Sequence, residues 1–323
     1  MKRKNLRGVI GYSLAVCMIT INCSSSFVFA QKGVNMPQSQ IRMASTEKVE
    51  LDNGIVLNSK EMGQGDVTIV FDTGYGSTLD NFTYMQGELS KIAKTLTYDR
   101  AGLGESSDTG NMAPLSDNER KTLIDGGVIE YNEADFDGTT KTAKDKAENL
   151  YKLLQAKNLP EPYILVTHSL GGHTAIEFAK MHKEKVDGIV FIDSTGRSAN
   201  GEMYDFFESF VPGMGDEQLS VYNKHDGTLD EALMGENQVK NDKNALRDIP
   251  LLYLECDPYA MAQGAMGDAF AELKTKQISD LLSMSDDTKH VQIKGATHQV
   301  HIDKPEETLA NVTEFINYCI EKN

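Results

Sequence analysis

The sequence around Ser169 has the residue types and spacing of a serine nucleophile held on a sharp turn. An apolar run that begins at Tyr163 stops abruptly at Ser169, and Gly171 and Gly172 then precede a helical pattern. A strand that turns into a helix within two or three residues exposes the side chain at its apex, in the pattern G-x-S-x-G. Glycine is favoured because strand and helix nearly touch there. Thr167 replaces the first glycine, and the alternative interpretation is a buried strand followed by a Ser-Gly-Gly loop.

The elements that must position Ser169 alternate between strand and helix. After a hairpin at 48–57, short apolar runs predict strands, and apolar residues at helical spacing predict helices. The strands are expected at 67–71, 95–98, 163–168, 187–192, 251–254 and 290–293. The helices are expected at 82–92, 142–157, 173–180, 270–282 and 305 onward. A capping box formed by Asp303 and Glu306 is expected to start the last helix. This alternation predicts an α/β fold with a mostly parallel, doubly wound sheet.

Sites in such sheets form at the carboxyl ends of the strands. Ser169, the loops at Gly74 and Gly102, and the segment 295–301 are all expected at that edge. Two stretches interrupt the alternation. Residues 107–140 are acidic and weakly patterned, and residues 194–249 carry an apolar cluster that forms either plain packing or an acyl pocket: Met203, Tyr204, Phe206, Phe207, Phe210 and Val211.

The first 30 residues have the pattern of an export signal. Lys2, Arg3, Lys4 and Arg7 precede an apolar stretch at 8–21, and Val28-Phe29-Ala30 supplies the small residues of a cleavage site. The apolar stretch is shorter than the roughly 20 residues of a membrane span. We therefore predict a signal peptide at 1–30, a flexible leader at 31–45 and one domain at 46–323. The mature protein is expected to be secreted or extracytoplasmic, without a membrane span.

Composition limits the partners and the chemistry. The net charge of the 323-residue chain is −16, and the chain after Ala30 keeps 28 basic against 48 acidic residues. Such an excess of negative charge argues against nucleic acid and anionic lipid as partners. After Ala30 only Cys256 and Cys319 remain. They lack metal-ligand spacing and are too few for a disulfide framework, so two buried thiols are the expectation.

Four segments, in order, resemble the α/β-hydrolase family over about residues 47–320. They are Thr73-Gly74-Tyr75-Gly76, Asp99-Arg-Ala-Gly-Leu-Gly-Glu-Ser106, His168-Ser169-Leu170-Gly171-Gly172 and Thr297-His298-Gln-Val-His301. The family usually has His-Gly where this chain has Thr73-Gly74. The resemblance implies an α/β-hydrolase fold with a helical cap inserted at about 194–249. It also implies that neither a cofactor nor a metal is needed.

The resemblance assigns roles to individual residues. Ser169 would be the nucleophile and His298 the base, because imidazole has a suitable pKa; His301 is the alternative base. The N–H groups of Tyr75 and Leu170 would stabilise the oxyanion. The acid is expected at Asp257, in the loop after the strand that follows the cap, with Glu255 and Asp193 as alternatives. His168, His173 and His182 are expected to be structural, as are Asp99 and Arg100.

The expected function is that of an exported serine hydrolase acting on a carboxylic ester, or on an amide, thioester or lactone, of a small molecule. A serine nucleophile argues against the family's dehalogenases and epoxide hydrolases, which use aspartate. Aminopeptidase or amidase activity is a lesser alternative, since the Gly-Gly-Ser-Trp elbow of proline iminopeptidases is missing. A rival from another class is a ligand-binding protein or receptor that keeps the fold without turnover, which the departures at Thr73 and Thr167 favour. The sequence leaves the substrate and the oligomeric state open.

Overall fold

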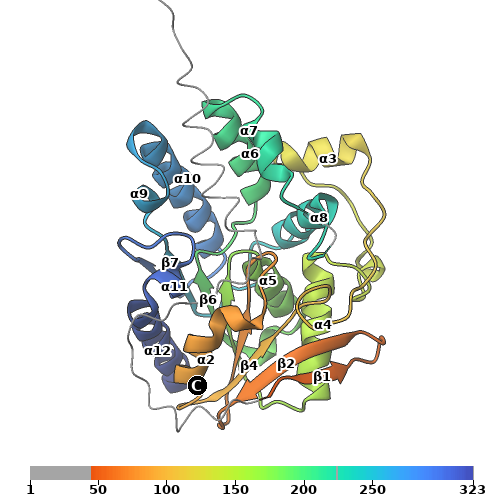
Figure 1. The fold of residues 1–323 in the computed structure, drawn as a ribbon, viewed down its shortest axis with the longest axis vertical. Helices are drawn as coiled ribbons and strands as arrows, with labels where there is room; N and C mark the ends of the chain where they lie inside the picture. The colour runs from red at the N-terminus through yellow and green to blue at the C-terminus, as the bar shows by residue number, and fades with distance from the viewer. Residues whose placement is uncertain (1–44, 223–224, 323) are drawn as a thin grey trace, which may run out of the picture.

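An eight-stranded sheet forms the centre of the protein. The computed structural model describes residues 45–222 and 225–322, and Figure 1 shows their arrangement. The strand order is β1-β2-β4-β3-β5-β6-β7-β8, and only the pairs β1–β2 and β2–β4 are antiparallel. The strands are β1 Glu47–Glu50, β2 Val56–Met62, β3 Thr68–Asp72, β4 Lys94–Tyr98, β5 Tyr163–His168, β6 Val186–Ile192, β7 Leu251–Glu255 and β8 Thr288–Gln292. The predicted α/β class and mostly parallel sheet are confirmed.

The central strands are buried on both faces, which is why they read as nearly continuous apolar runs. In β3, Phe71 lies opposite Val166 of β5, which in turn lies opposite Val190 of β6. All three side chains are almost completely buried. This register places the carboxyl ends of β3, β5, β6 and β7 side by side.

Helices cover both faces of the sheet (Figure 1). On one face, α4 (Ala143–Ala156) and α5 (Gly171–Met181) bury their apolar residues against the sheet. On the other face, α2 (Thr83–Leu89) and α12 (Pro305–Lys322) do the same. The remaining short helices outside the cap are η1 Leu79–Phe82, η2 Glu133–Asp135, η3 Lys183–Lys185, α9 Pro258–Met261 and α11 Val300–Asp303. A long helix, α10, covers Gly264–Leu282.

Three helices inserted between β6 and β7 form a cap over the carboxyl ends of the strands (Figure 1): α6 Ala199–Phe210, α7 Met214–Leu219 and α8 Leu229–Lys240. The acidic excursion at 107–140 joins them. Its helix α3 (Asp117–Ile124) starts at a capping box formed by Ser116 and Glu119. Leu123 of α3 then packs with Leu233 and Met234 of α8 in a small apolar cluster. The cap is therefore built from two segments that are distant in sequence.

The predicted capping box at Asp303 is wrong. Asp303 ends α11, and its carboxylate accepts hydrogen bonds from the backbone N and the hydroxyl of Thr297, at 2.7 and 2.6 Å. Helix α12 begins two residues later, at Pro305. Asp303 thus fixes the loop that precedes His298, instead of starting the terminal helix.

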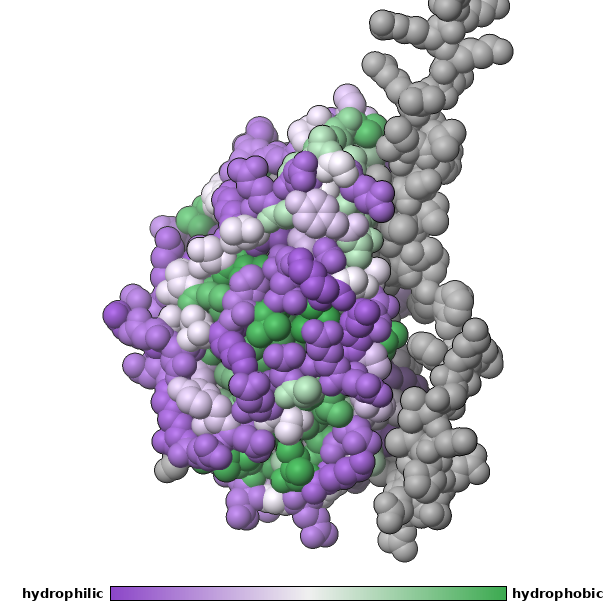
Figure 2. Space-filling model, turned by 90° about the vertical axis from the view of Figure 1, so that its left-hand side faces the viewer, coloured by the Kyte–Doolittle hydropathy of each residue, from purple (hydrophilic) through white to green (hydrophobic). Residues whose placement is uncertain are grey.

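The face of the molecule shown in Figure 2 is mostly polar. Figure 2 shows the side that carries α9, α10 and α12, where apolar residues form separate patches among polar ones. Within residues 45–222 and 225–322, no helix is both long and apolar enough to cross a bilayer. The predicted signal peptide at 1–30 and nearly all of the predicted leader lie outside the described residues.

A buried carboxyl group joins two helices of the cap. Glu236 of α8 is only 1% exposed, and its Oε1 accepts a hydrogen bond of 2.6 Å from the backbone N of Asn200 in α6. Burial raises the pKa of Glu236 to about 8, although the Asn200 N–H and Lys240 act in the opposite direction. The group is therefore protonated in the folded protein at neutral pH and ionised in the unfolded chain.

This shift makes stability depend on pH. Glu236 is protonated in both states below pH 4.5, and its contribution to stability is lost as the pH rises toward 8. Glu236→Gln mimics the protonated group, so its advantage over wild type should grow by about 1 kcal/mol per pH unit across that window. Urea unfolding at pH 5, 6.5 and 8 measures this. The change Glu272→Gln, at an exposed site of α10, is the control, and equal slopes for both variants would contradict the prediction.

Candidate active site

Ser169 occupies the apex of a sharp turn between β5 and α5. Its φ is +51°, in the left-handed region that residues other than glycine rarely adopt. The glycines that follow are required by close packing. A Cβ on Gly171 would lie 2.6 Å from the backbone O of Asp72, and one on Gly172 would lie 2.8 Å from Cβ of Ser194. The turn is thus strained and tightly packed, as the G-x-S-x-G pattern predicts.

Thr167 fits at the position where the pattern has glycine. Its side chain is 1% exposed, and its hydroxyl donates to the backbone O of Val190 at 3.1 Å. The same hydroxyl lies 3.2 Å from Oγ of Ser194. Both polar partners come from β6 or the residues just after it, so the departure from glycine leaves no unpaired group and does not disturb the turn.

His298 contacts Asp193. Nδ1 of His298 lies 2.6 Å from Oδ2 of Asp193. Asp193 directly follows β6 and has φ +42°, a conformation that aspartate tolerates better than most residues. Both residues line the same cavity as Ser169. A hydroxyl, an imidazole and a carboxylate thus line one cavity at the carboxyl ends of β5, β6 and β8.

The structure does not place Asp257, the predicted acid, in contact with His298; Asp193, weighed as an alternative, has that contact. Asp257 is the N-cap of α9: Oδ1 accepts from the N of Tyr259 at 3.1 Å, and Oδ2 accepts from the N of Gly295 at 2.9 Å. These two bonds hold its carboxylate away from His298. Glu255 is also elsewhere, since its Oε2 lies 3.0 Å from Nε2 of His290 in β8.

Asp193 also contacts a buried cation. Nζ of Lys274, in α10, lies 2.8 Å from Oδ1 of Asp193 and donates to the hydroxyl of Tyr253 at 3.2 Å. Burial alone would raise the pKa of Asp193, but Lys274 and His298 hold it well below its ordinary value. Burial would likewise lower the pKa of Lys274, and Asp193 instead raises it well above its ordinary value. Sequence reasoning missed Lys274, because nothing local distinguishes it from the other lysines of its helix.

Two further histidines pack behind His298. Nε2 of His168 lies 2.9 Å from the backbone O of His298, and the two rings are 4.6 Å apart. His168 therefore contacts the loop that carries His298, and it lines the cavity as well. His301, the alternative base, instead stacks on Phe82 and bonds to Asn81 through Nε2. Burial lowers the pKa of His301 to about 3.

The loop after β3 lies directly against Ser169. A Cβ on Gly74 would lie 3.1 Å from Cβ of Ser169. The hydroxyl of Thr73 donates to the backbone O of Ser77 at 2.9 Å, which closes the loop on itself. This bond explains how the loop keeps its form without the usual histidine. Tyr75 follows Gly74 and lines the cavity.

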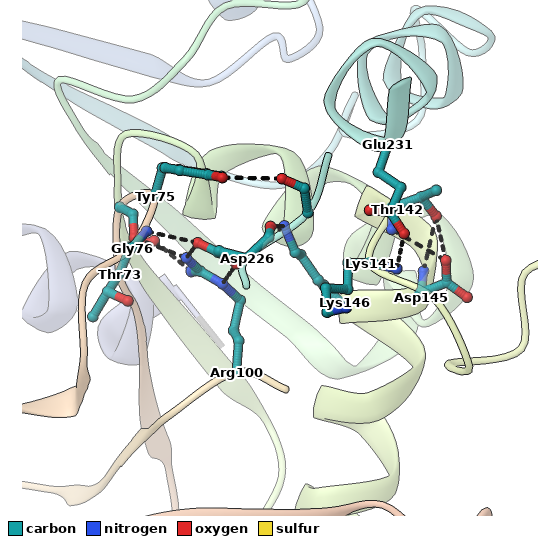
Figure 3. Close-up of polar contacts among 12 residues, drawn as sticks. Thr73, Tyr75, Gly76, Arg100, Lys141, Thr142, Asp145, Lys146, Asp226 and Glu231 are labelled. Carbon is teal, nitrogen blue, oxygen red and sulfur yellow. Dashed lines mark hydrogen bonds and ion pairs between the residues drawn. The ribbon is translucent and has the colours of Figure 1, made fainter. Parts of the chain in front are cut away.

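A buried network of charges holds this loop in place (Figure 3). Arg100 donates to the backbone O atoms of Thr73 and Gly74 at 2.6 and 2.8 Å, and to Oδ1 of Asp72 at 2.5 Å. It also donates to Asp226 of the cap at 2.5 and 3.1 Å. Asp99, which was also expected to be structural, accepts a hydrogen bond from the N of Leu79.

Asp226 connects the cap to the same loop. Its Oδ2 accepts from the N of Gly76 at 2.8 Å, and Nζ of Lys146 lies 3.3 Å from its Oδ1. The neighbouring Gly227 accepts from the hydroxyl of Tyr75 at 3.0 Å (Figure 3). Burial would raise the pKa of Asp226, but Arg100 and Lys146 lower it below the ordinary value. Asp226 thus fixes the backbone after Tyr75, and Arg100 fixes the backbone before it.

The cavity has a volume of about 170 Å³. Its lining combines the residues described above with polar and apolar groups from α6, α7, α9 and α10, from the segment after α7 and from the residue before α11: Ala199, Asn200, Met203, Gln218, Val221, Tyr222, Met261, Phe270, Gln277 and Gln299. Of the apolar cluster at 203–211, only Met203 is among them. Phe206 and Phe207 are buried in the core cluster that includes β3 and α12, so this cluster is mainly packing. Within the described residues, no group of three or more His, Cys, Asp or Glu side chains could hold a metal ion.

The comparison with known families identifies the fold. A family model described as "alpha/beta hydrolase fold" matches residues 67–304, well over half of the chain. The chain belongs to the α/β-hydrolase family. Its sequence is similar to the YqjL protein of Bacillus subtilis, with 25% identity over 268 residues, which cover 82% of this chain and 90% of YqjL.

Solved α/β-hydrolase structures share the fold of this chain. A thermophilic esterase from Thermogutta terrifontis has a TM-score of 0.54 and 18% identity, over 85% of this chain and 99% of the esterase. An esterase from Exiguobacterium antarcticum has a TM-score of 0.52 and 13% identity, over 84% of this chain and 100% of that one. At these identities the likeness concerns the fold.

The Arg100–Asp226 contact can be tested through stability. Asp226→Asn leaves the buried guanidinium without one of its two carboxylates, and removing one partner of a buried ion pair should lower the free energy of unfolding by about 3 kcal/mol. Urea unfolding at pH 7 measures the change. The control is Asp125→Asn, which breaks the exposed Lys121–Asp125 pair and should leave stability unchanged. Equal effects of the two substitutions would show that the Arg100–Asp226 contact contributes no more to the free energy of unfolding than an exposed ion pair does.

Proposed function

We propose that the protein is a serine hydrolase that cleaves a carboxylic ester, with Ser169 as nucleophile, His298 as base and Asp193 as acid. The observation that supports this proposal most strongly is the 2.6 Å contact between His298 and Asp193 in the cavity that Ser169 also lines. The positive φ of Ser169 adds to it, because such strain is typical of an exposed nucleophile at an elbow. The solved esterases with the same fold make ester cleavage the leading reaction.

In the proposed reaction, Oγ of Ser169 attacks the ester carbonyl while its proton passes to Nε2 of His298. Asp193 accepts a hydrogen bond from Nδ1, which fixes the tautomer that leaves Nε2 unprotonated, and it stabilises the imidazolium that forms. The proton then passes to the leaving alcohol, and the acyl group remains on Ser169. Water, activated by the same imidazole, releases the acid and restores the serine.

The developing oxyanion would be stabilised by the N–H groups of Leu170 and Tyr75. Leu170 immediately precedes α5, so its N–H belongs to the positive end of that helix. Tyr75 lies in the loop that Arg100 and Asp226 hold on both sides. Losing one donor of this kind typically costs about 3 kcal/mol of transition-state stabilisation.

Lys274 would act as a positioning residue for Asp193. Its ammonium holds one carboxylate oxygen, which leaves the other directed at His298. The cation also offsets part of the negative charge that the imidazolium would otherwise face. The carboxylate of Asp193 consequently stays ionised although it is almost completely buried. Because Lys274 neutralises part of its charge, it attracts protonated His298 less strongly.

The small cavity favours short acyl groups, since sites for drug-sized ligands occupy about 300–1,000 Å³. Export is a second part of the proposal, and it is supported by the basic and apolar pattern of residues 1–30. The rival proposal, a ligand-binding protein without turnover, loses support from the fit of Thr167 and Thr73, since neither departure disturbs the site.

Covalent labelling tests the nucleophile. A fluorophosphonate probe should label the purified protein at one residue, because it phosphonylates a serine activated by a base, and peptide mapping should locate the label at Ser169. Ser169→Ala should abolish labelling, while Ser194→Ala, at a hydroxyl in the same cavity, should retain it. Labelling that persists in Ser169→Ala would refute the assignment. Folded wild type that neither reacts nor hydrolyses p-nitrophenyl acetate would favour the binding-protein rival.

A second experiment separates the two carboxylates. Asp193→Asn should lower turnover of p-nitrophenyl acetate by about 10⁴-fold, because an amide at this place favours the wrong tautomer of the histidine. Asp257→Asn should remain close to wild type, since Asp257 caps a helix away from His298. Circular dichroism melting curves confirm that both variants fold. If Asp257→Asn lost turnover and Asp193→Asn remained active, Asp257 and not Asp193 would be the acid.

A further inference from the structure

Two amide side chains in the wall of the cavity lack partners for their N–H groups. Asn200 and Gln277 are 7% and 8% exposed, and both line the cavity beside Ser169. Within the described residues, Nδ2 of Asn200 and Nε2 of Gln277 are buried and have no hydrogen-bond partner. Leaving a buried donor unpaired costs about 1–3 kcal/mol, so native proteins rarely keep two such groups in one place.

The surrounding structure holds both amides in position. Asn200 is fixed at the start of α6, where its backbone N donates to Glu236 and its Oδ1 accepts from the hydroxyl of Tyr222 at 2.5 Å. Gln277 lies on α10, one turn from Lys274 and two turns from Phe270, on the face that lines the cavity. A Cβ on Gly196 would lie 3.2 Å from Cβ of Gln277, so the glutamine stem is packed closely.

The charges beside the two amides balance. Lys274 is paired with Asp193, at 2.8 Å. Glu236, next to Asn200, is protonated at neutral pH because burial raises its pKa to about 8. The wall that contains the two amides thus carries no surplus positive charge. Such a wall suits a carbonyl or ether oxygen better than a carboxylate, whose desolvation would need a full countercharge.

We propose that Asn200 and Gln277 form a subsite for a second, uncharged oxygen acceptor in the substrate, beside the ester group that is cleaved. This inference rests on the proposed function and narrows it to small oxygenated esters, such as keto esters or alkoxyalkyl esters. The acceptor completes the hydrogen bonding of the two amides when the substrate is bound. A site built in this way discriminates strongly against analogues that lack the acceptor, because those leave the donors unpaired.

Matched esters test the subsite. On the acyl side, p-nitrophenyl 4-oxopentanoate is compared with p-nitrophenyl pentanoate, and on the alcohol side 2-methoxyethyl acetate is compared with butyl acetate. Each kcat/KM is divided by the rate of the same ester with hydroxide, which removes intrinsic reactivity. In at least one pair, the corrected kcat/KM of wild type should be about tenfold higher for the oxygenated ester. This is the difference that one well-formed hydrogen bond produces.

Substitutions then locate the preference. Gln277→Met and Asn200→Leu remove the donors at similar volume, and each should reduce the preference for the oxygenated ester to about one-third or less. The readout is a ratio of two substrates on one variant, so a general loss of activity cancels. Gln155→Met, on the exposed face of α4, is the control and should keep the wild-type ratio. Melting curves and fluorophosphonate labelling of Ser169 verify that each variant is folded.

Several outcomes would overturn the inference. Wild type that is labelled at Ser169 and hydrolyses both members of each pair equally well would refute the subsite and leave the hydrolase proposal intact. A preference that survives in both variants would place the acceptor site elsewhere. A larger preference for p-nitrophenyl hemisuccinate than for the keto ester would show that the wall selects a charged group. Absence of both labelling and hydrolysis would refute the proposed function and this inference together.

Discussion

The buried guanidinium of Arg100 is the contact on which the site depends. It binds the end of β3 through Asp72, the following loop through two backbone carbonyls, and the cap through Asp226. Few other side chains could do this, because arginine has five N–H donors in a rigid planar group and keeps its charge when buried. Burying such a charge is costly unless it is fully paired. The form of the loop beside Ser169 therefore depends on its contact with the cap.

A second buried pair, Lys274 with Asp193, sets the electrostatics of the proposed triad. A carboxylate that is 4% exposed would lose much of its charge by protonation without a cation beside it. Lys274 prevents this, but it also competes with His298 for the same carboxylate. Lys274 thus has two effects: it keeps Asp193 ionised over a wide range of pH, and it reduces the stabilisation of the imidazolium by Asp193.

The sequence was sufficient to predict those structural features that depend on residues close together in the chain. The strand, the serine and the two glycines at 163–172 lie together, so the elbow and the parallel sheet followed from local pattern. Asp257 was expected beside His298, but Asp193 has that contact, because the pairing depends on how β6 and β7 align with the loop at 295–298, which no local pattern encodes. Asp257 looked free to turn, yet its two oxygens hold the backbone N–H groups of Gly295 and Tyr259. The available signal for Asp193 was its place directly after a buried strand.

Hydrogen bonding differs between the positions where the sequence departs from the family pattern and the wall of the cavity. Where the sequence departs from the family pattern in the scaffold, the new polar group is paired: the hydroxyl of Thr73 with Ser77, and that of Thr167 with Val190. In the cavity wall, by contrast, Asn200 and Gln277 keep unpaired donors within the described structure. Eight other buried side-chain atoms of the described residues also lack partners, among them Nδ1 of His168 and Oε1 of Gln299, which line the same cavity. Local rules are broken chiefly at functional sites. Four of these ten atoms belong to residues that line the proposed active site, which supports the assignment of the two amides to the substrate.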